Sequence, residues 1–264
     1  MKIGFIGGGN MGGAIVGGIL KAKIVPPSDI IVTDKNEAAI EKLSAEYGVA
    51  TDINNLPAAG HVDILFLCVK PQFLYSVIDE IKERVPENTV IVSIAAGQSI
   101  EAIENAFGRK IKLVRVMPNT PALVGEGMAA LVPNENVNDN ELKSIVEIFN
   151  SFGKCEVVSE NLMDAVTAVS GSSPAYVFMM IEAMADAAVM GGMPRSQAYT
   201  FAAQSVLGSA KMVLETCKHP GELKDMVCSP AGTTIAAVAA LEKDGFRNAI
   251  IDAMNECMKK SSQL

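Results

Sequence analysis

A short segment near the end of the chain has the residue types of an anion-binding turn. Residues Ser229–Thr234 read Ser-Pro-Ala-Gly-Thr-Thr and directly precede an apolar helical pattern at Ile235–Leu241. The first amides of a helix have no partner within the helix, so such a turn suits a small carboxylate. The same residues also fit a simpler interpretation, a helix start at which a threonine is the N-cap.

A glycine-rich loop lies at the other end of the chain, between a strand pattern and a helix pattern. Residues 7–12 read Gly-Gly-Gly-Asn-Met-Gly, which is the G-x-G-x-x-G dinucleotide fingerprint in its required context. We expect Gly7 to permit a tight turn, Gly9 to let the backbone approach a pyrophosphate, and Gly12 to let the helix pack closely on the strand. The predicted cofactor contacts in this loop are Gly7, Gly8, Gly9, Asn10, Met11 and Gly12.

The second predicted strand, Ile30–Asp34, ends where such folds place the residue that contacts the adenosine ribose. Asp34 favours a free 2′-hydroxyl and therefore NADH, whereas Lys35 can meet a 2′-phosphate and therefore favours NADPH. Asn36 can cap the next helix and also contact the cofactor. We predict cofactor contacts for Asp34, Lys35 and Asn36, and these residues alone leave the choice of cofactor open.

Composition narrows the class of protein. A chain of 264 residues is long enough for a nucleotide domain of about 150 residues and a second unit. The net charge of −8 argues against nucleic acid and anionic membranes as partners. The chain has two histidines and five cysteines without a C-x-x-C pair, so we expect no metal site and a reduced, cytoplasmic protein. The first strand begins at Met1 and leaves no room for a signal peptide.

Strands and helices alternate up to about residue 159, which predicts an α/β domain. Apolar runs predict strands at 64–69, 90–94, 113–117, 128–132 and 155–158, and helical spacing predicts a helix at 138–152. Ligands of open α/β sheets bind at the carboxyl ends of the strands. The candidates there are Asn119 and the predicted cofactor contacts Val69, Lys70, Pro71, Ala95, Ala96 and Gly97. The small Ala95–Gly97 corner leaves room for a flat nicotinamide ring, although Lys70 also fits an exposed strand end and Asn119 a turn.

From residue 160 onward the pattern is helical, so we predict two domains, 1–159 and 160–264. Helices are expected at 161–169, 174–190, 196–216 and 246–260. The stretch Pro174–Met193 is apolar around most of its circumference, but Glu182 and Asp186 interrupt it and argue against a membrane span. We therefore expect an oligomer in which this helix is buried between chains.

Six motifs follow one another along the chain, and together they resemble the pyrroline-5-carboxylate reductases, particularly the bacterial enzymes of proline synthesis. The motifs are residues 5–12, 69–71, 93–97, 117–121, 170–176 and 229–234. The resemblance covers the whole chain. It implies an N-terminal Rossmann-type domain followed by an all-α dimerisation domain, with assembly beyond the dimer expected. The implied reaction is reduction of a cyclic imine, 1-pyrroline-5-carboxylate, to L-proline by hydride from NADPH, with NADH possible.

The resemblance also implies roles for individual residues. It places the substrate carboxylate on Gly232 and Thr233 and gives Thr234 the contact to the ring nitrogen, as the catalytic residue. Because a hydroxyl is a poor acid, Thr234 orients the imine first and donates a proton second, and the imine can arrive already protonated. Single-residue matches assign Glu160 to the substrate and Asn55 to the cofactor.

The chain departs from the family pattern at three positions, and two other functions fit its residues less well. Ala231 replaces a glycine of the turn, and Cys217 and Met226 replace polar ligand contacts, so those contacts are not transferred. A β-hydroxyacid dehydrogenase needs an acid–base lysine on the first interdomain helix, yet no lysine occurs between Lys154 and Lys211. A protein that binds NAD(P) without turnover has no need for the intact turn.

Overall fold

The computed structural model describes residues 1–263 and divides into two compact units. The first unit comprises Met1–Ser172 together with the chain from Cys257 onward, and the second comprises Ser173–Glu256. By this division, residues 160–172, which the sequence placed in the helical domain, belong to the first unit. The predicted domain boundary between residues 159 and 160 stays a prediction.

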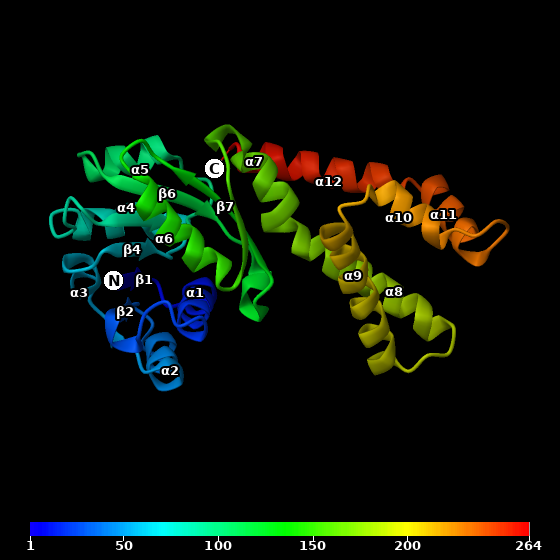
Figure 1. The fold of residues 1–264 in the computed structure, drawn as a ribbon, viewed down its shortest axis with the longest axis horizontal. Helices are drawn as coiled ribbons and strands as arrows, with labels where there is room; N and C mark the ends of the chain where they lie inside the picture. Colours follow the sequence, from blue (N-terminus) through cyan, green and yellow to red (C-terminus); the bar gives the residue numbers. More distant parts are fainter. Residues whose placement is uncertain (264) are drawn as a thin grey trace. The chain divides into compact units, whose positions relative to one another are not determined.

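The first unit is built on one eight-stranded sheet with the order β3-β2-β1-β4-β5-β6-β7-β8 (Figure 1). All neighbouring strands are parallel except β6 and β7, which are antiparallel. The short polar strand β3 was not predicted, because three residues carry no periodicity signal. The strands are β1 (Ile3–Ile6), β2 (Ile30–Thr33), β3 (Ala50–Asp52), β4 (Ile64–Leu67), β5 (Val90–Ser93), β6 (Lys112–Met117), β7 (Gly127–Pro133) and β8 (Gly153–Val157).

Helices cover both faces of this sheet, which explains why its central strands are apolar at nearly every position. Alternate residues of each strand enter separate cores: Phe5 and Phe66 stack at 4.6 Å in one, and Leu65 and Leu67 lie in the other. Helices α1 (Asn10–Lys21), α2 (Glu37–Tyr47) and α6 (Asp139–Asn150) contribute to the first core. Helices α3 (Leu56–Gly60), α4 (Pro71–Ile81) and α5 (Ile100–Phe107) contribute to the second. The predicted α/β architecture is confirmed.

The helical run that follows the sheet is more irregular than predicted. The expected helix at 161–169 consists of the 3₁₀ turn η3 (Glu160–Leu162), the short helix α7 (Met163–Val166) and the π-helical turn η4 (Thr167–Ser172). The end of α12 (Phe246–Ser261) packs on this run, where Ser261 Oγ donates to Asp164 Oδ1 at 2.7 Å. These contacts explain why the chain from Cys257 onward belongs to the first unit.

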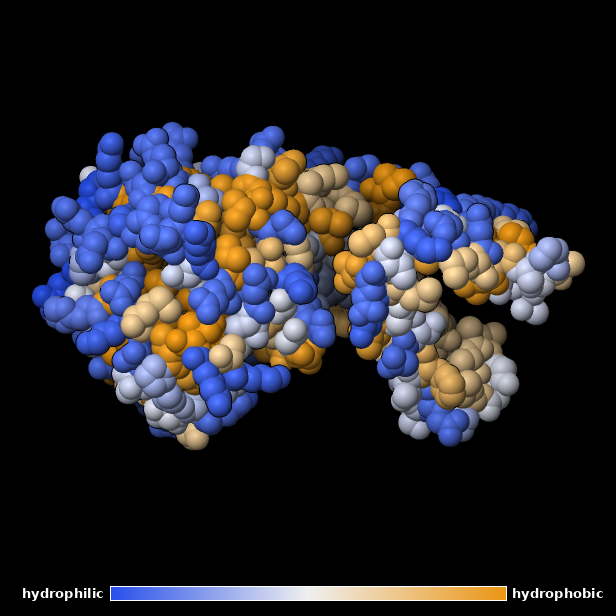
Figure 2. All heavy atoms as spheres, in the orientation of Figure 1, coloured by the Kyte–Doolittle hydropathy of each residue, from blue (hydrophilic) through white to orange (hydrophobic). Residues whose placement is uncertain are grey.

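The second unit consists of helices with little apolar burial. They are α8 (Ser173–Met190), α9 (Arg195–Thr216), α10 (Pro220–Val227), α11 (Thr233–Lys243) and the first part of α12. Within the described part of this unit the buried apolar residues are the alanines 185, 198 and 202. Large apolar side chains reach the surface instead (Figure 2), among them Phe178, Met179, Met190, Phe201 and Leu214. By length and composition alone, the helical run Glu160–Met190 could also cross a membrane.

Candidate functional site

Four loops meet at one edge of the sheet because the strands before them are parallel neighbours. The carboxyl ends of β1, β4, β5 and β6 lie side by side in the sheet order. They lead into the glycine loop, the segment 69–71, the segment 95–97 and Asn119. The structure therefore brings together the loops that the sequence predicted for the cofactor, and the edge is where open α/β sheets bind ligands.

The glycines of the loop meet three different environments. Gly7 has a φ of +111°, and an added Cβ would lie 2.5 Å from the carbonyl oxygen of Cys68. At Gly12 an added Cβ would lie 2.2 Å from the Gly7 oxygen, which shows the close contact between helix α1 and strand β1. At Gly9, by contrast, no atom lies within 4 Å of that position. The open space stands at the start of α1, whose N-cap Gly9 leaves the first amides without a side-chain partner, and a pyrophosphate fits there.

The residues after β2 are held by hydrogen bonds to the glycine loop, to the start of α2 and to the segment after β3. Asp34 Oδ2 accepts from the Gly8 amide at 2.7 Å, and its Oδ1 accepts from the Asn36 amide at 2.9 Å. Asn36 is the N-cap of α2 as expected, although its side chain makes no capping bond. Lys35 Nζ donates to the Ile53 carbonyl at 3.2 Å in an exposed position. Asp34 thus ties the glycine loop to the start of α2 and orders both.

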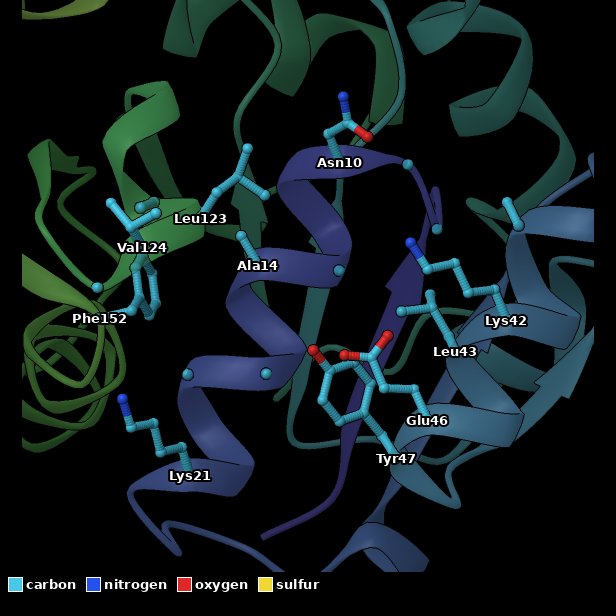
Figure 3. A pocket seen from close by; sticks show the side chains of 18 of the residues that line it. Asn10, Ala14, Lys21, Lys42, Leu43, Glu46, Tyr47, Leu123, Val124 and Phe152 are labelled. Atoms are coloured by element: carbon cyan, nitrogen blue, oxygen red, sulfur yellow. The ribbon is translucent and has the colours of Figure 1, made fainter. Parts of the chain in front are cut away.

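A groove of about 710 Å³ extends this edge along α1. Figure 3 shows Asn10 at one end of it and Lys21 near the other. Helix α2 forms one wall, with Lys42, Leu43, Glu46 and Tyr47, and Leu123, Val124 and Phe152 form the opposite wall. Gly8, Gly9 and Asn36 also line the groove, so its upper end coincides with the predicted cofactor loop.

The next two loops differ in how accessible they are. Lys70 is the exposed N-cap of α4, which begins at Pro71, and the N-terminus of this helix faces the same edge as the glycine loop. Ala95 is buried and Gly97 has a φ of +73°, so the 95–97 corner turns sharply without bulky side chains. This geometry agrees with the space expected for a flat ring.

Asn55 lies in a different setting from the other predicted contacts. Its side chain is buried, accepts a hydrogen bond from Thr33 Oγ1 at 3.0 Å and donates to Glu80 Oε2 at 2.9 Å. These bonds connect the end of β2 with α4 and occupy both ends of the amide. Its predicted cofactor contact stays a prediction, and its visible role is to hold β2, α3 and α4 together.

In the second unit, the 229–234 turn has the geometry of an open helix start. Helix α11 begins at Thr233 and its N-cap is Gly232, so the alternative in which a threonine is the N-cap is wrong. Ala231 has a φ of +54°, the left-handed conformation that glycine adopts at lower energy. The alanine therefore preserves the path of the turn. A Cβ at Gly232 would lie 2.4 Å from Ser229 Oγ and 3.1 Å from the Ser229 carbonyl oxygen, so the turn is closely packed there and a larger residue would require the serine side chain to rotate.

Glu160 and Asn119 make contacts that sequence reasoning did not foresee. Glu160 Oε1 pairs with Arg115 Nη1 and accepts from the Ile100 amide, both at 2.8 Å. Asn119 Oδ1 accepts from the Met128 amide at 2.8 Å, and its Nδ2 donates to the Ser170 carbonyl at 3.2 Å. The one available signal for this network was a lone arginine in the otherwise apolar run 113–117.

The side chains that could bind a metal ion do not cluster in the part of the chain that the structure describes. Among the described residues, no group of three or more His, Cys, Asp or Glu side chains is placed to hold a metal ion. The five cysteines are free, and burial raises the pKa of the Cys68 thiol beside the glycine loop. The arrangement therefore offers backbone amides, hydroxyls and a small-residue corner as its chemical groups.

Comparison with known proteins identifies the family. The chain is 51% identical over 263 residues to the pyrroline-5-carboxylate reductase of Escherichia coli (strain K12), covering 100% of this chain and 98% of that protein. The chain belongs to the pyrroline-5-carboxylate reductase family. Residues 160–264 match the family model for pyrroline-5-carboxylate reductase dimerisation, which supports self-association. Residues 2–97 match the model for NADP oxidoreductase, coenzyme F420-dependent.

Solved structures of the family have the same fold along the whole chain. The pyrroline-5-carboxylate reductase from Coxiella burnetii is 34% identical with a TM-score of 0.92, covering 99% of this chain and 97% of that one. The Plasmodium falciparum pyrroline carboxylate reductase, solved with NADP bound, is 34% identical with a TM-score of 0.89, covering 100% and 97%. The predicted Rossmann-type domain and helical C-terminal domain are thus confirmed.

Proposed function

We propose that this protein reduces 1-pyrroline-5-carboxylate to L-proline with a hydride from NADPH, and that it also accepts NADH. The observation that carries the proposal is full-length membership of the reductase family, combined with an open glycine loop at one end and an uncapped helix start in the 229–234 turn. When bound, the reduced dinucleotide supplies the hydride, which forms the new C–H bond at the imine carbon. The C=N bond becomes a single bond, and the ring nitrogen keeps or gains a proton.

The first unit provides the cofactor contacts. The amides of Gly9–Gly12 and the positive end of the α1 dipole hold the pyrophosphate, for which the open space at Gly9 leaves room. Gly8 lines the same loop, and its amide donates to Asp34. Asp34, Lys35 and Asn36 lie where the adenosine ribose binds. Val69–Pro71 and Ala95–Gly97 line the nicotinamide end, and their small or main-chain surfaces let the ring lie flat. Asn55 bonds to Thr33 at the end of β2, directly before the ribose residues, and to Glu80 on α4, and we assign it a cofactor contact on that side.

The 229–234 turn provides the substrate contacts. The carboxylate lies at Gly232 and Thr233, as an anion at a helix N-terminus that has no side-chain cap. The Thr233 amide is the direct donor, because the Gly232 amide already donates to the Ser229 carbonyl at 3.0 Å and so shapes the turn. Thr234 follows within the first turn of α11, where its hydroxyl holds the ring nitrogen. In the reactive iminium form the ring nitrogen is already protonated and has no free lone pair, so the hydroxyl accepts a hydrogen bond from its N–H and orients the substrate.

A second copy of this chain is the proposed partner of the exposed helices. Met190 is 89% exposed and Leu214 is 78% exposed in the single chain, and the matched dimerisation model spans both. Burial of such side chains against another copy removes apolar surface from water at about 25 cal/mol per Å². Asp186 pairs with Arg195 on the exposed surface of the same helices, which disfavours a lipid environment. We therefore propose a cytoplasmic homodimer, or a higher oligomer, that binds neither membrane nor nucleic acid.

Substitution of Thr234 tests the assignment of the substrate site. Thr234→Ala should lower kcat about a hundredfold and leave the Kd of NADPH unchanged, because one positioned hydrogen-bonding group contributes a factor of roughly 10² to 10⁴. Thr234→Ser should recover part of kcat. The assay follows NADPH absorbance with the cyclic imine as substrate. A Thr234→Ala enzyme with full kcat would show that the hydroxyl has no part in the reaction.

A further inference from the structure

One carboxylate joins three segments of the first unit that lie far apart in the sequence. Glu160 Oε1 accepts from the Ile100 amide and pairs with Arg115 Nη1, both at 2.8 Å. Ile100 is the first residue of α5, and it follows the Ala95–Gly97 corner by three residues. Arg115 lies on β6, and its side chain is 12% exposed. A single oxygen therefore ties the start of α5 both to the sheet and to the segment that begins at Glu160.

The other contacts of this loop come from nearby or from α4. The Ala95 amide donates to Ser93 Oγ at 3.4 Å, and Ser99 Oγ accepts from the Ala102 amide at 3.1 Å as the N-cap of α5. Gln98 bonds to the Tyr75 hydroxyl. The contact from Glu160 differs because it places a negative charge at the N-terminus of α5, where the helix dipole favours it. Arg115 balances that charge in a partly buried position.

We propose that Glu160 and Arg115 are positioning residues that hold the nicotinamide corner through Ile100. The inference rests on the proposed function, which places the nicotinamide at Ala95–Gly97. It assigns Glu160 to the cofactor end of the reaction and not to the substrate, because its Oε1 is engaged by two donors inside the first unit. A corner that is already ordered does not have to be ordered when the cofactor binds, so the pair acts by pre-organisation.

Two single variants and one double variant test this role. Glu160→Ala removes the acceptor for the Ile100 amide, and Arg115→Met removes the charge that holds the carboxylate in place. The double variant Arg115→Met with Glu160→Gln removes both charges but keeps an acceptor for Ile100. Lys112→Met is the matched control, since Lys112 lies on the same strand, pairs with Glu141 and has a similarly part-buried side chain away from the corner.

The measured quantities are the Kd of NADPH from its own fluorescence, the KM of each substrate, kcat and the melting temperature. Glu160→Ala and Arg115→Met should raise the Kd and KM of NADPH about tenfold, a factor equivalent to about 1.4 kcal/mol, with the KM of the imine within twofold of the unmodified protein. The double variant should recover most of the NADPH affinity. Lys112→Met should leave both constants unchanged.

Three results would overturn the inference. An increase confined to the KM of the imine would make Glu160 a substrate contact. Unchanged NADPH binding in both single variants would show that the pair has no bearing on the corner. A double variant as weak as Glu160→Ala, with a normal melting temperature, would show that the hydrogen bond to Ile100 is not the operative contact.

Two provisions cover a variant that does not fold and an unmodified protein that does not reduce the imine. If Glu160→Ala does not fold, Glu160→Met removes the same acceptor while it keeps most of the side-chain volume. Failure of the proposed function would appear as absence of imine reduction by the unmodified protein. The NADPH binding data, taken without substrate, still decide the inference in that case.

Discussion

Two glycines of the same loop should respond to the same substitution in opposite ways. At Gly12 an added Cβ would lie 2.2 Å from the Gly7 carbonyl oxygen, a backbone atom that cannot rotate aside. Helix α1 must then move from β1 by about 1 Å, and overpacking of this kind costs about 3 kcal/mol. For a unit of this size, such a loss lowers the melting temperature by roughly 6–12 °C. Gly12→Ala should therefore be markedly unstable.

Gly9→Ala should instead spare stability and lose cofactor. Its φ of −70° and ψ of −168° suit alanine, and no atom lies within 4 Å of the new Cβ. A less favourable N-cap costs about 1 kcal/mol or less. The methyl group occupies the space proposed for the pyrophosphate, and loss of one charge-assisted hydrogen bond, about 1.5–3 kcal/mol, weakens NADPH binding roughly 10- to 100-fold.

Thermal unfolding and NADPH fluorescence titration of both variants provide the check. The reasoning about the site fails if Gly9→Ala binds NADPH as tightly as the unmodified protein. The reasoning about packing fails if Gly12→Ala melts at the unmodified temperature. Reversed results, a stable Gly12→Ala and an unstable Gly9→Ala, would contradict the glycine environments themselves.

Three further predictions concern the cofactor, the assembly and the thiols. Lys35→Ala should raise the KM of NADPH much more than that of NADH, because only NADPH presents a 2′-phosphate; equal effects would remove Lys35 from that site. Met184→Glu should dissociate or unfold the oligomer, since an unpaired buried charge costs several kcal/mol, and a folded monomer of the unmodified protein in sedimentation at micromolar concentration would contradict the proposed assembly. Cys68, with its pKa raised by burial, should resist alkylation at pH 8 in the native protein. Cys217 is exposed in the single chain and should react, unless the second copy of the chain covers it. Mass spectrometry of the labelled peptides distinguishes the two cysteines.

Local patterns were sufficient to predict every strand of the sheet except β3, and the loops that follow them. The apolar runs at 64–69, 90–94 and 113–117 indicate strands covered on both faces, and parallel neighbours place their carboxyl ends at one edge. The glycine loop was predicted because the spacing of its glycines between a strand and a helix matches a known fingerprint, although the carbonyl oxygen that excludes a side chain at Gly7 belongs to the distant Cys68. Helices α8, α9 and α12 likewise follow from the spacing of their apolar residues.

The sequence by itself determined the features that depend on residues close together: the apolar strands, the long helices, the glycine loop and the turn at 229–234. The tertiary structure alone decided which distant groups share an atom. Glu160 meets Ile100 and Arg115 across 60 and 45 residues of chain, and Asn55 meets Glu80 across 25. The N-cap at Gly232 and the breaks at η3 and η4 likewise depend on backbone geometry. Hydrogen bonds of this kind leave no periodic pattern in the sequence, because they form between single side chains that the folded elements bring together.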